Sequence, residues 1–218
     1  MTDPVVLAGA TSSLGSLGDE RLLTETERGR AARMRRPADR ADYIAAHLLA
    51  RHCAAELLGR PPGTLTLAQR CGDCDATGHG RPYFAEAPEV GVSLTHTRGY
   101  VCAAAGPGKV GVDAERVPDG PFDDAVAGQS LAPGEVAVVT GNRALIRQWV
   151  RKESLVKRGE LTLAGLRSLD LSALPLDEPG VARALRWQGR HLLEWAEGDV
   201  LVTAITDSPA RRSFVFTP

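Results

Sequence analysis

The order of helical and strand-like segments constrains this chain most, because the same order occurs in each half. Residues 19–60 have a helical pattern, and strand candidates follow at Val92–Leu94, Tyr100–Ala105 and Val110–Glu115. The second half also has a helix followed by strands, although the sequence contains no strong internal repeat. It has an expected helix over Arg143–Arg158 and expected strands over Ala184–Trp187, His191–Trp195, Val200–Ile205 and Ser213–Phe216. Glycine-containing turns separate most of these strands. The sequence therefore predicts an α+β fold of two similar α/β subdomains.

Capping residues predict where the helices begin and end. Asp39 is a candidate N-cap for a helix that ends at Leu58, since a glycine and two prolines follow. Ser130 is a second candidate N-cap, for a short helix that reaches Val139. Residues 61–91 are rich in glycine and proline, so we expect mainly loops there.

The composition is that of an ordinary globular protein. The chain has 218 residues, of which 43% are hydrophobic, and its formal net charge is −1, so overall charge does not favour nucleic acid. No apolar stretch approaches the roughly 20 residues of a membrane helix, and the first nine residues lack the pattern of a signal peptide. Four scattered cysteines do not make a disulfide framework. We therefore expect a cytoplasmic protein that binds neither nucleic acid nor membrane.

Three carboxylates and a lysine form the main candidate site. Asp113 and Glu115 lie two apart on a predicted strand, so their side chains point to the same face. Neighbouring carboxylates repel each other unless a cation lies between them, and Mg²⁺ binds both carboxylates and substrate phosphates. Glu153 and Lys157 lie one turn apart on the predicted helix and share a face. Taken singly, these pairs are better explained by a solvent-facing strand end and by an ordinary surface ion pair.

Further upstream, two segments contain residues suited to phosphate or metal. Thr95 and His96 lie at the end of a predicted strand, and Arg81 lies on a loop stiffened by proline; all three could bind a phosphate. Cys71 and Cys74, followed by a histidine at position 79, have the spacing of a zinc knuckle. No second pair of ligands completes a tetrahedral site in sequence. Zinc binding and simple packing of a cysteine-containing loop therefore both stay open.

In this order, the motifs resemble those of the 4'-phosphopantetheinyl transferases of the surfactin-synthetase-activating type. That family has a G-V-D-x-E segment and, further on, W-x-x-K-E-[AS]-x-x-K, which match Gly111–Glu115 and Trp149–Lys157. Upstream it has a G-[KR]-P loop and an S-x-[ST]-H-[ST] strand end, which match Gly80–Pro82 and Ser93–Thr97. Each motif alone is weak, whereas the ordered set over residues 80–159 is specific.

The resemblance implies a reaction and an architecture. Such enzymes transfer the 4'-phosphopantetheine arm of coenzyme A to a serine of an apo acyl or peptidyl carrier protein, and adenosine 3',5'-bisphosphate is released. The implied form is a monomer of two pseudo-symmetric halves, here residues 1–106 and 107–218, with the active site between them. The first half would bind the nucleotide of coenzyme A, and the second would supply the metal ligands and the catalytic helix.

Residue roles follow from the matching motif positions. The resemblance implies that Mg²⁺ is held by Asp113, Glu115 and Glu153. Glu153 is also the candidate base, and Lys157 would neutralise charge on the diphosphate, assisted by Lys152. The nucleotide and its 3'-phosphate would be held by Arg81, Thr95, His96, Lys157 and Arg40. Arg40 is included because Asp42 occupies the position of a family arginine, and the neighbouring arginines at positions 33, 36, 40 and 51 are its candidate replacements.

Two other classes of function use some of the same residues. A Mg²⁺-dependent nucleotide or diphosphate hydrolase would also need three acids and a lysine, but it leaves residues 80–82 and 93–97 unexplained. A binding module would combine a zinc knuckle with residues 21–60, whose nine arginines could contact RNA or an acidic protein. Aromatic residues make up only 5% of the chain, which argues against RNA. The identity of the acceptor carrier does not follow from the sequence.

Overall fold

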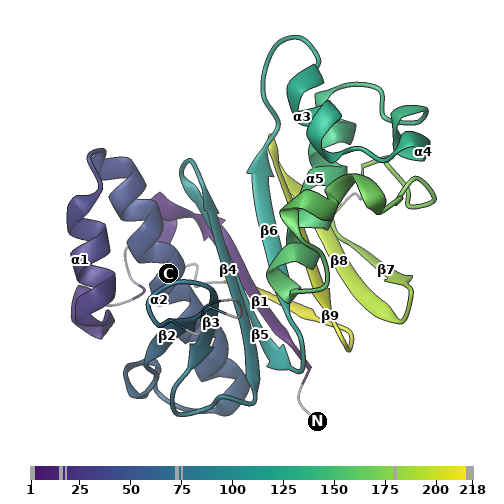
Figure 1. Cartoon of the computed structure of the whole chain (residues 1–218). Helices are drawn as coiled ribbons and strands as arrows, with labels where there is room; N and C mark the ends of the chain where they lie inside the picture. The colour runs from purple at the N-terminus through teal and green to yellow at the C-terminus, as the bar shows by residue number, and fades with distance from the viewer. Residues whose placement is uncertain are drawn as a thin grey trace.

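Two four-stranded sheets lie side by side, and a long helix covers the outer face of each (Figure 1). The computed structural model describes residues 3–14, 17, 19–71, 74, 76–178 and 181–214. The protein belongs to the α+β class, as its sequence predicts. No helix in the described ranges has the length and apolar character that a membrane span requires.

The first sheet is built from both ends of the chain. Its order is β10–β1–β5–β4, with the bounds Arg211–Phe214, Val5–Ala10, Tyr100–Pro107 and Val90–Thr97. β1 pairs parallel with β10, and the other neighbours pair antiparallel. The helix α2 (Pro37–Leu58) packs on one face, where Leu7 and Val101 are buried against it. Alternate residues of β1 and β5 point the other way, toward the second sheet.

The second sheet has the order β6–β9–β8–β7 and is antiparallel throughout. The strands comprise Gly111–Arg116, Val200–Thr206, Arg190–Glu197 and Arg183–Trp187. The helix α5 (Asn142–Arg158) packs closely on β6 and β9. Gly111 permits this approach, since a Cβ atom there would lie 2.0 Å from the carbonyl oxygen of Ser154. The Ser154 hydroxyl donates to the carbonyl oxygen of Thr203 at 2.8 Å, which ties α5 to β9.

The facing sides of the two sheets form an apolar layer that joins the halves. Val6, Cys102 and Ala104 of the first sheet are buried in one cluster with residues of the second sheet, among them Val112 and Trp195. At the edge of this layer, the backbone N–H of Val112 on β6 donates to Ser93 Oγ on β4 at 3.0 Å. This bond holds the ends of β4 and β6 next to each other, and both strands carry predicted site residues.

Shorter elements complete the described part of the chain. The helices are α1 (Glu25–Arg33), α3 (Asp124–Ser130) and α4 (Pro133–Val136), and the strands β2 (Leu67–Arg70) and β3 (Arg81–Phe84) form a two-stranded hairpin. Four 3₁₀ helices span Thr11–Leu14, Glu20–Leu22, Pro62–Thr64 and Leu163–Ser168.

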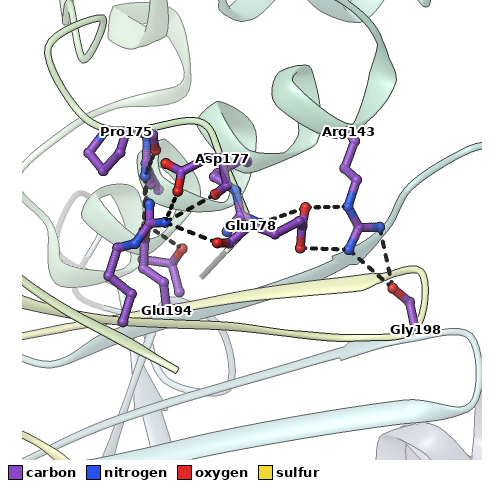
Figure 2. A network of polar contacts seen from close by, with 10 residues as sticks. Arg143, Pro175, Asp177, Glu178, Glu194 and Gly198 are labelled. Carbon is purple, nitrogen blue, oxygen red and sulfur yellow. Dashed lines mark hydrogen bonds and ion pairs between the residues drawn. The ribbon is translucent and has the colours of Figure 1, made fainter. Parts of the chain in front are cut away.

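Arginine–carboxylate pairs fix α5 against its surroundings on the side away from the first sheet. Arg143 donates to both carboxylate oxygens of Glu178 and to the carbonyl oxygen of Gly198 (Figure 2). Arg151 forms a two-pronged pair with Glu194 at 2.6 and 2.9 Å, and both side chains are fully buried. Paired charges of this kind set the position of a helix more than they stabilise the fold, because desolvation offsets much of their attraction.

The structure corrects several predicted boundaries. α2 begins at Pro37 rather than after Asp39, because proline is well suited to the first helical turn. Ser130 ends α3 instead of capping a new helix, and its hydroxyl donates to the carbonyl oxygen of Val126. The loop expected at 61–91 contains the β2–β3 hairpin.

The predicted final strand lies only partly within the described residues, and the segment 107–218 is not confined to one sheet. β10 ends at Phe214, so the last two positions of the expected strand Ser213–Phe216 lie outside the described residues. A boundary after residue 106 falls at the end of β5. However, β10 pairs with β1 and so belongs to the first sheet, although it lies in the segment 107–218.

Candidate active site

Two adjoining pockets open where β4, β6 and α5 meet. Their volumes are about 450 and about 290 Å³. The larger pocket is lined by Leu94, Thr95, His96, Asp113, Glu115, Trp149, Glu153, Lys157 and Leu163. The smaller pocket is lined by Tyr43, His47, Gln69, Gly80, Arg81, Pro82, Ser93, Leu94, His96, Val156 and Lys157. Because the two pockets share Leu94, His96 and Lys157, we call them together the cleft.

Asp113 is the best-anchored carboxylate of the cleft. It is buried on β6, and its Oδ1 accepts hydrogen bonds from Lys157 Nζ at 2.7 Å and from Thr95 Oγ1 at 3.1 Å. Its Oδ2 is buried and has no hydrogen-bond partner among the described residues. A buried carboxylate oxygen without a donor is unfavourable, so this oxygen is suited to a ligand cation.

Glu115 and Glu153 line the same pocket as Asp113, and the charge of Asp113 shifts their pKa values. Burial raises the pKa of both glutamates, and the negative charge of Asp113 raises each pKa further. Lys157 offsets the effect in part. The three acids therefore form a region of crowded negative charge, where a cation is strongly favoured.

The carboxylate oxygens of Asp113, Glu115 and Glu153 are not all close enough together to bind one metal ion as they lie. Among the described residues, only Cys71, Cys74 and His79 have candidate ligand atoms that all lie within 4.8 Å of one another. In the cleft, the Lys157 ammonium lies 2.7 Å from Asp113 Oδ1, next to the position that a metal ion bound to Asp113 would occupy. An ion held by all three acids therefore requires rotation of the two glutamate side chains, which are only half-buried.

The other end of the cleft is basic. Arg81 begins β3, and its guanidinium lies against Gly159, which ends α5 in a left-handed conformation with φ of 71°. The last carbonyl groups of a helix attract a cation, which favours this position for the arginine. His96 borders both pockets, and desolvation lowers its pKa. Arg81 and Lys157 thus supply positive charge for an anionic ligand.

Lys152 and Thr95 make contacts that the sequence did not predict. Lys152 is fully buried, pairs with Glu135, and donates to the carbonyl oxygens of Ser130 and Leu166 at 2.7 and 2.9 Å. It does not reach the cleft, so the suggestion that it assists transfer is wrong. Thr95 lines the larger pocket, and its hydroxyl donates to Asp113 at 3.1 Å, so it positions that carboxylate.

The N-terminal arginines also fall outside the cleft. Arg40 pairs with Glu20 at 2.6 Å and lines neither pocket, which contradicts the prediction that it binds the nucleotide. Arg51 is fully buried and forms a two-pronged pair with Glu27. Asp42 is structural too, since it accepts hydrogen bonds from the Thr11 hydroxyl and the Gly99 backbone N–H.

Sequence reasoning missed the contribution of α2 to the cleft. Tyr43 and His47 lie one turn apart, and both line the smaller pocket. The His47 ring stacks on Tyr43, and its Nδ1 donates to the carbonyl oxygen of Tyr43 at 2.8 Å. Burial lowers the pKa of His47 to about 4, so the ring is neutral at physiological pH. The available signal was a polar face on α2 beside the apolar stripe.

Comparison with protein-family models gives no match for this chain, and comparison with curated proteins gives none either. The motifs, and the cleft in which their residues meet, are therefore the features that indicate a function.

Proposed function

We propose that this protein is a 4'-phosphopantetheinyl transferase that acts on an apo acyl or peptidyl carrier protein. One observation carries the proposal: residues from all four sequence motifs line a single cleft. Arg81 comes from β3, His96 from β4, Asp113 from β6, and Glu153 and Lys157 from α5. Unrelated surface charges would not be expected to converge from four separate elements.

The arrangement of the halves supports the same proposal. Each half places one long helix, α2 or α5, on the outer face of a four-stranded sheet. The cleft receives residues from both helices and from the edge strands β4 and β6. We infer two pseudo-symmetric subdomains with the active site between them, working as a monomer in the cytoplasm.

The acidic end of the cleft fits a Mg²⁺ ion. The unpartnered Oδ2 of Asp113, and the pKa values of Glu115 and Glu153 that burial and the charge of Asp113 raise, favour a cation there. Carboxylate oxygens are ligands that Mg²⁺ prefers, and these three acids would hold it. When bound, the ion would neutralise charge on the diphosphate of coenzyme A.

Glu153 is the proposed proton acceptor. In the proposed reaction it takes the proton of the carrier serine hydroxyl, directly or through a water. The serine oxygen then forms a bond to the phosphorus that carries the pantetheine arm. The bond from that phosphorus to the bridging oxygen breaks, and adenosine 3',5'-bisphosphate leaves.

Lys157 and Arg81 supply the positive charge that the reaction needs. Phosphoryl-type transfer depends on positioning and on charge neutralisation more than on covalent help from the protein. Lys157 is held in the cleft by Asp113 and lies one turn from Glu153. Arg81, at the other end, is suited to the nucleotide phosphates.

Gly159→Ala should weaken coenzyme A binding about tenfold, equal to about 1.4 kcal/mol. A Cβ atom at this position would lie 1.4 Å from Arg81 Nη2, so the guanidinium must move. The measurement is titration calorimetry with coenzyme A and Mg²⁺. Gly59→Ala is the matched control, because Gly59 also ends a helix with positive φ but has nothing within 4 Å of the added atom. Equal affinities for the two variants would show that Arg81 does not bind coenzyme A.

Nucleotide release tests the reaction class. The protein is incubated with coenzyme A and Mg²⁺, with and without an apo carrier, and adenosine 3',5'-bisphosphate is quantified by chromatography. Release only with the carrier, and loss of release with EDTA, is the expected result. Equal release without the carrier would indicate a diphosphate hydrolase instead.

A further inference from the structure

The β2–β3 hairpin contains a second group of side chains that the proposed reaction does not use. Cys71, Cys74 and His79 lie in the connection between the two strands, and their candidate ligand atoms are all within 4.8 Å of one another. The pair Cys74 Sγ and His79 Nε2 is separated by 3.5 Å. Cys71, Cys74 and His79 do not line the pocket that contains Asp113, Glu115 and Glu153.

Backbone contacts bring the ends of this connection together. The Cys71 N–H donates to the carbonyl oxygen of Ala76, and the Gly78 N–H donates to the carbonyl oxygen of Gln69, each at 3.0 Å. Gly80 then crosses directly over the first strand: an added Cβ atom would lie 2.6 Å from the Cα atom of Cys71. Its φ of 91° also favours glycine. These contacts place His79 beside the cysteines.

The ligand types and their separation fit a tetrahedral Zn²⁺ ion. Zinc binds thiolate sulfur at about 2.3 Å and imidazole nitrogen at about 2.0 Å, so a tetrahedral ion separates the two atoms by about 3.5 Å. The observed separation of Cys74 Sγ and His79 Nε2 has this value. Two thiolates and an imidazole suit zinc and are poor ligands for Mg²⁺.

We propose that Cys71, Cys74 and His79 bind one Zn²⁺ ion, with the fourth position available to water. The ion would close the hairpin connection through three coordinate bonds and stabilise it, since ligands on a loop are brought together only in the folded state. Thr77 and Gly78, from the same connection, line a further pocket of about 350 Å³ that also contains His47 and Gln69 of the cleft wall. The zinc ion would therefore support the wall of the cleft without taking part in chemistry.

Metal analysis of the full-length protein tests this proposal. The protein is purified without chelators, dialysed, and analysed by plasma mass spectrometry. We expect about one zinc per chain, and zinc content at least about tenfold lower in Cys74→Ser and in His79→Ala. His191→Ala is the matched control, because this half-buried histidine on β8 lies outside the cluster and should leave zinc content unchanged.

Two further readouts distinguish a bound zinc ion from a cluster that holds no metal. Cobalt-loaded wild-type protein should show a thiolate-to-cobalt charge-transfer band that Cys74→Ser lacks. A chelator should lower the melting temperature of the wild type but not that of Cys74→Ser. Zinc-free wild-type protein, zinc retained in both ligand variants, or a Cys71–Cys74 disulfide in place of the ion would overturn the proposal. Zinc content should be the same in Glu153→Gln as in the wild type. The zinc measurement therefore tests the metal site independently of the transferase reaction.

Discussion

Glu153→Gln is expected to reduce transfer by about 10³-fold or more while the protein remains folded, because it removes the proposed base and a proposed metal ligand together. The substitution should also leave the free energy of unfolding unchanged or higher at neutral pH. In the folded protein, burial and the charge of Asp113 raise the pKa of Glu153. The ionised side chain is therefore unfavourable in the fold, and a neutral glutamine relieves that cost. Initial transfer rates and urea unfolding measure the two effects.

The sign of the pH dependence follows from the raised pKa. Below the ordinary pKa of glutamate, Glu153 is protonated in both states, so wild type and variant should be equally stable. The wild type should lose stability relative to the variant as pH rises from the ordinary glutamate pKa through the raised folded value. Glu89→Gln, at an exposed position outside the cleft, is the control for both readouts. Turnover of Glu153→Gln within a few-fold of wild type would contradict the role of Glu153.

Lys152→Met is expected to lower the free energy of unfolding by about 3–5 kcal/mol, as when one partner of a buried ion pair is removed. Burial lowers the pKa of Lys152, and its pairing with Glu135 offsets part of that effect. Without the ammonium group, the buried Glu135 carboxylate loses its counter-charge. The carbonyl oxygens of Ser130 and Leu166 lose a donor as well. Urea unfolding monitored by circular dichroism is the measurement.

Two comparisons make the Lys152 prediction specific. Lys109→Met removes a lysine that is more than half exposed, and it should cost less than about 1 kcal/mol. Lys152→Met combined with Glu135→Gln should recover part of the loss, because no unpaired charge is then buried. A Lys152→Met protein of wild-type stability that had lost transfer activity would instead indicate a catalytic lysine.

Local patterns predicted α2, β4, β6 and α5, which line the cleft, but not β3, which supplies Arg81. The turns around Gly99 and Gly108 separate β4, β5 and β6. These turns are visible in the sequence, so the predicted strands lie close to the observed ones. β1 was missed because Val5–Ala10 is a continuous apolar run with no alternation of polar residues. It lies between two neighbours in the sheet and is buried on both faces. Its parallel partner β10 comes from the other end of the chain, and no local pattern reports such pairing.

For the candidate site, too, local patterns predicted what neighbouring residues do but not which distant residues meet. A spacing of two on a strand correctly predicted that Asp113 and Glu115 share a face. A spacing of four on a helix did the same for Glu153 and Lys157. Lys152 precedes Glu153 directly, so it lies about 100° away around the helix and points into the core. Motif resemblance alone does not distinguish these two directions. The Lys157–Asp113 ion pair joins residues 44 positions apart and depends on how α5 packs on β6.

Intact-mass measurement of an apo carrier protein, incubated with this protein, coenzyme A and Mg²⁺, tests the central claim most directly. The proposed function predicts a mass increase equal to one phosphopantetheinyl group. The increase should be lost when EDTA is added, and also when alanine replaces the acceptor serine of the carrier. No increase on any of several apo carriers, with the protein shown to be folded, would contradict it.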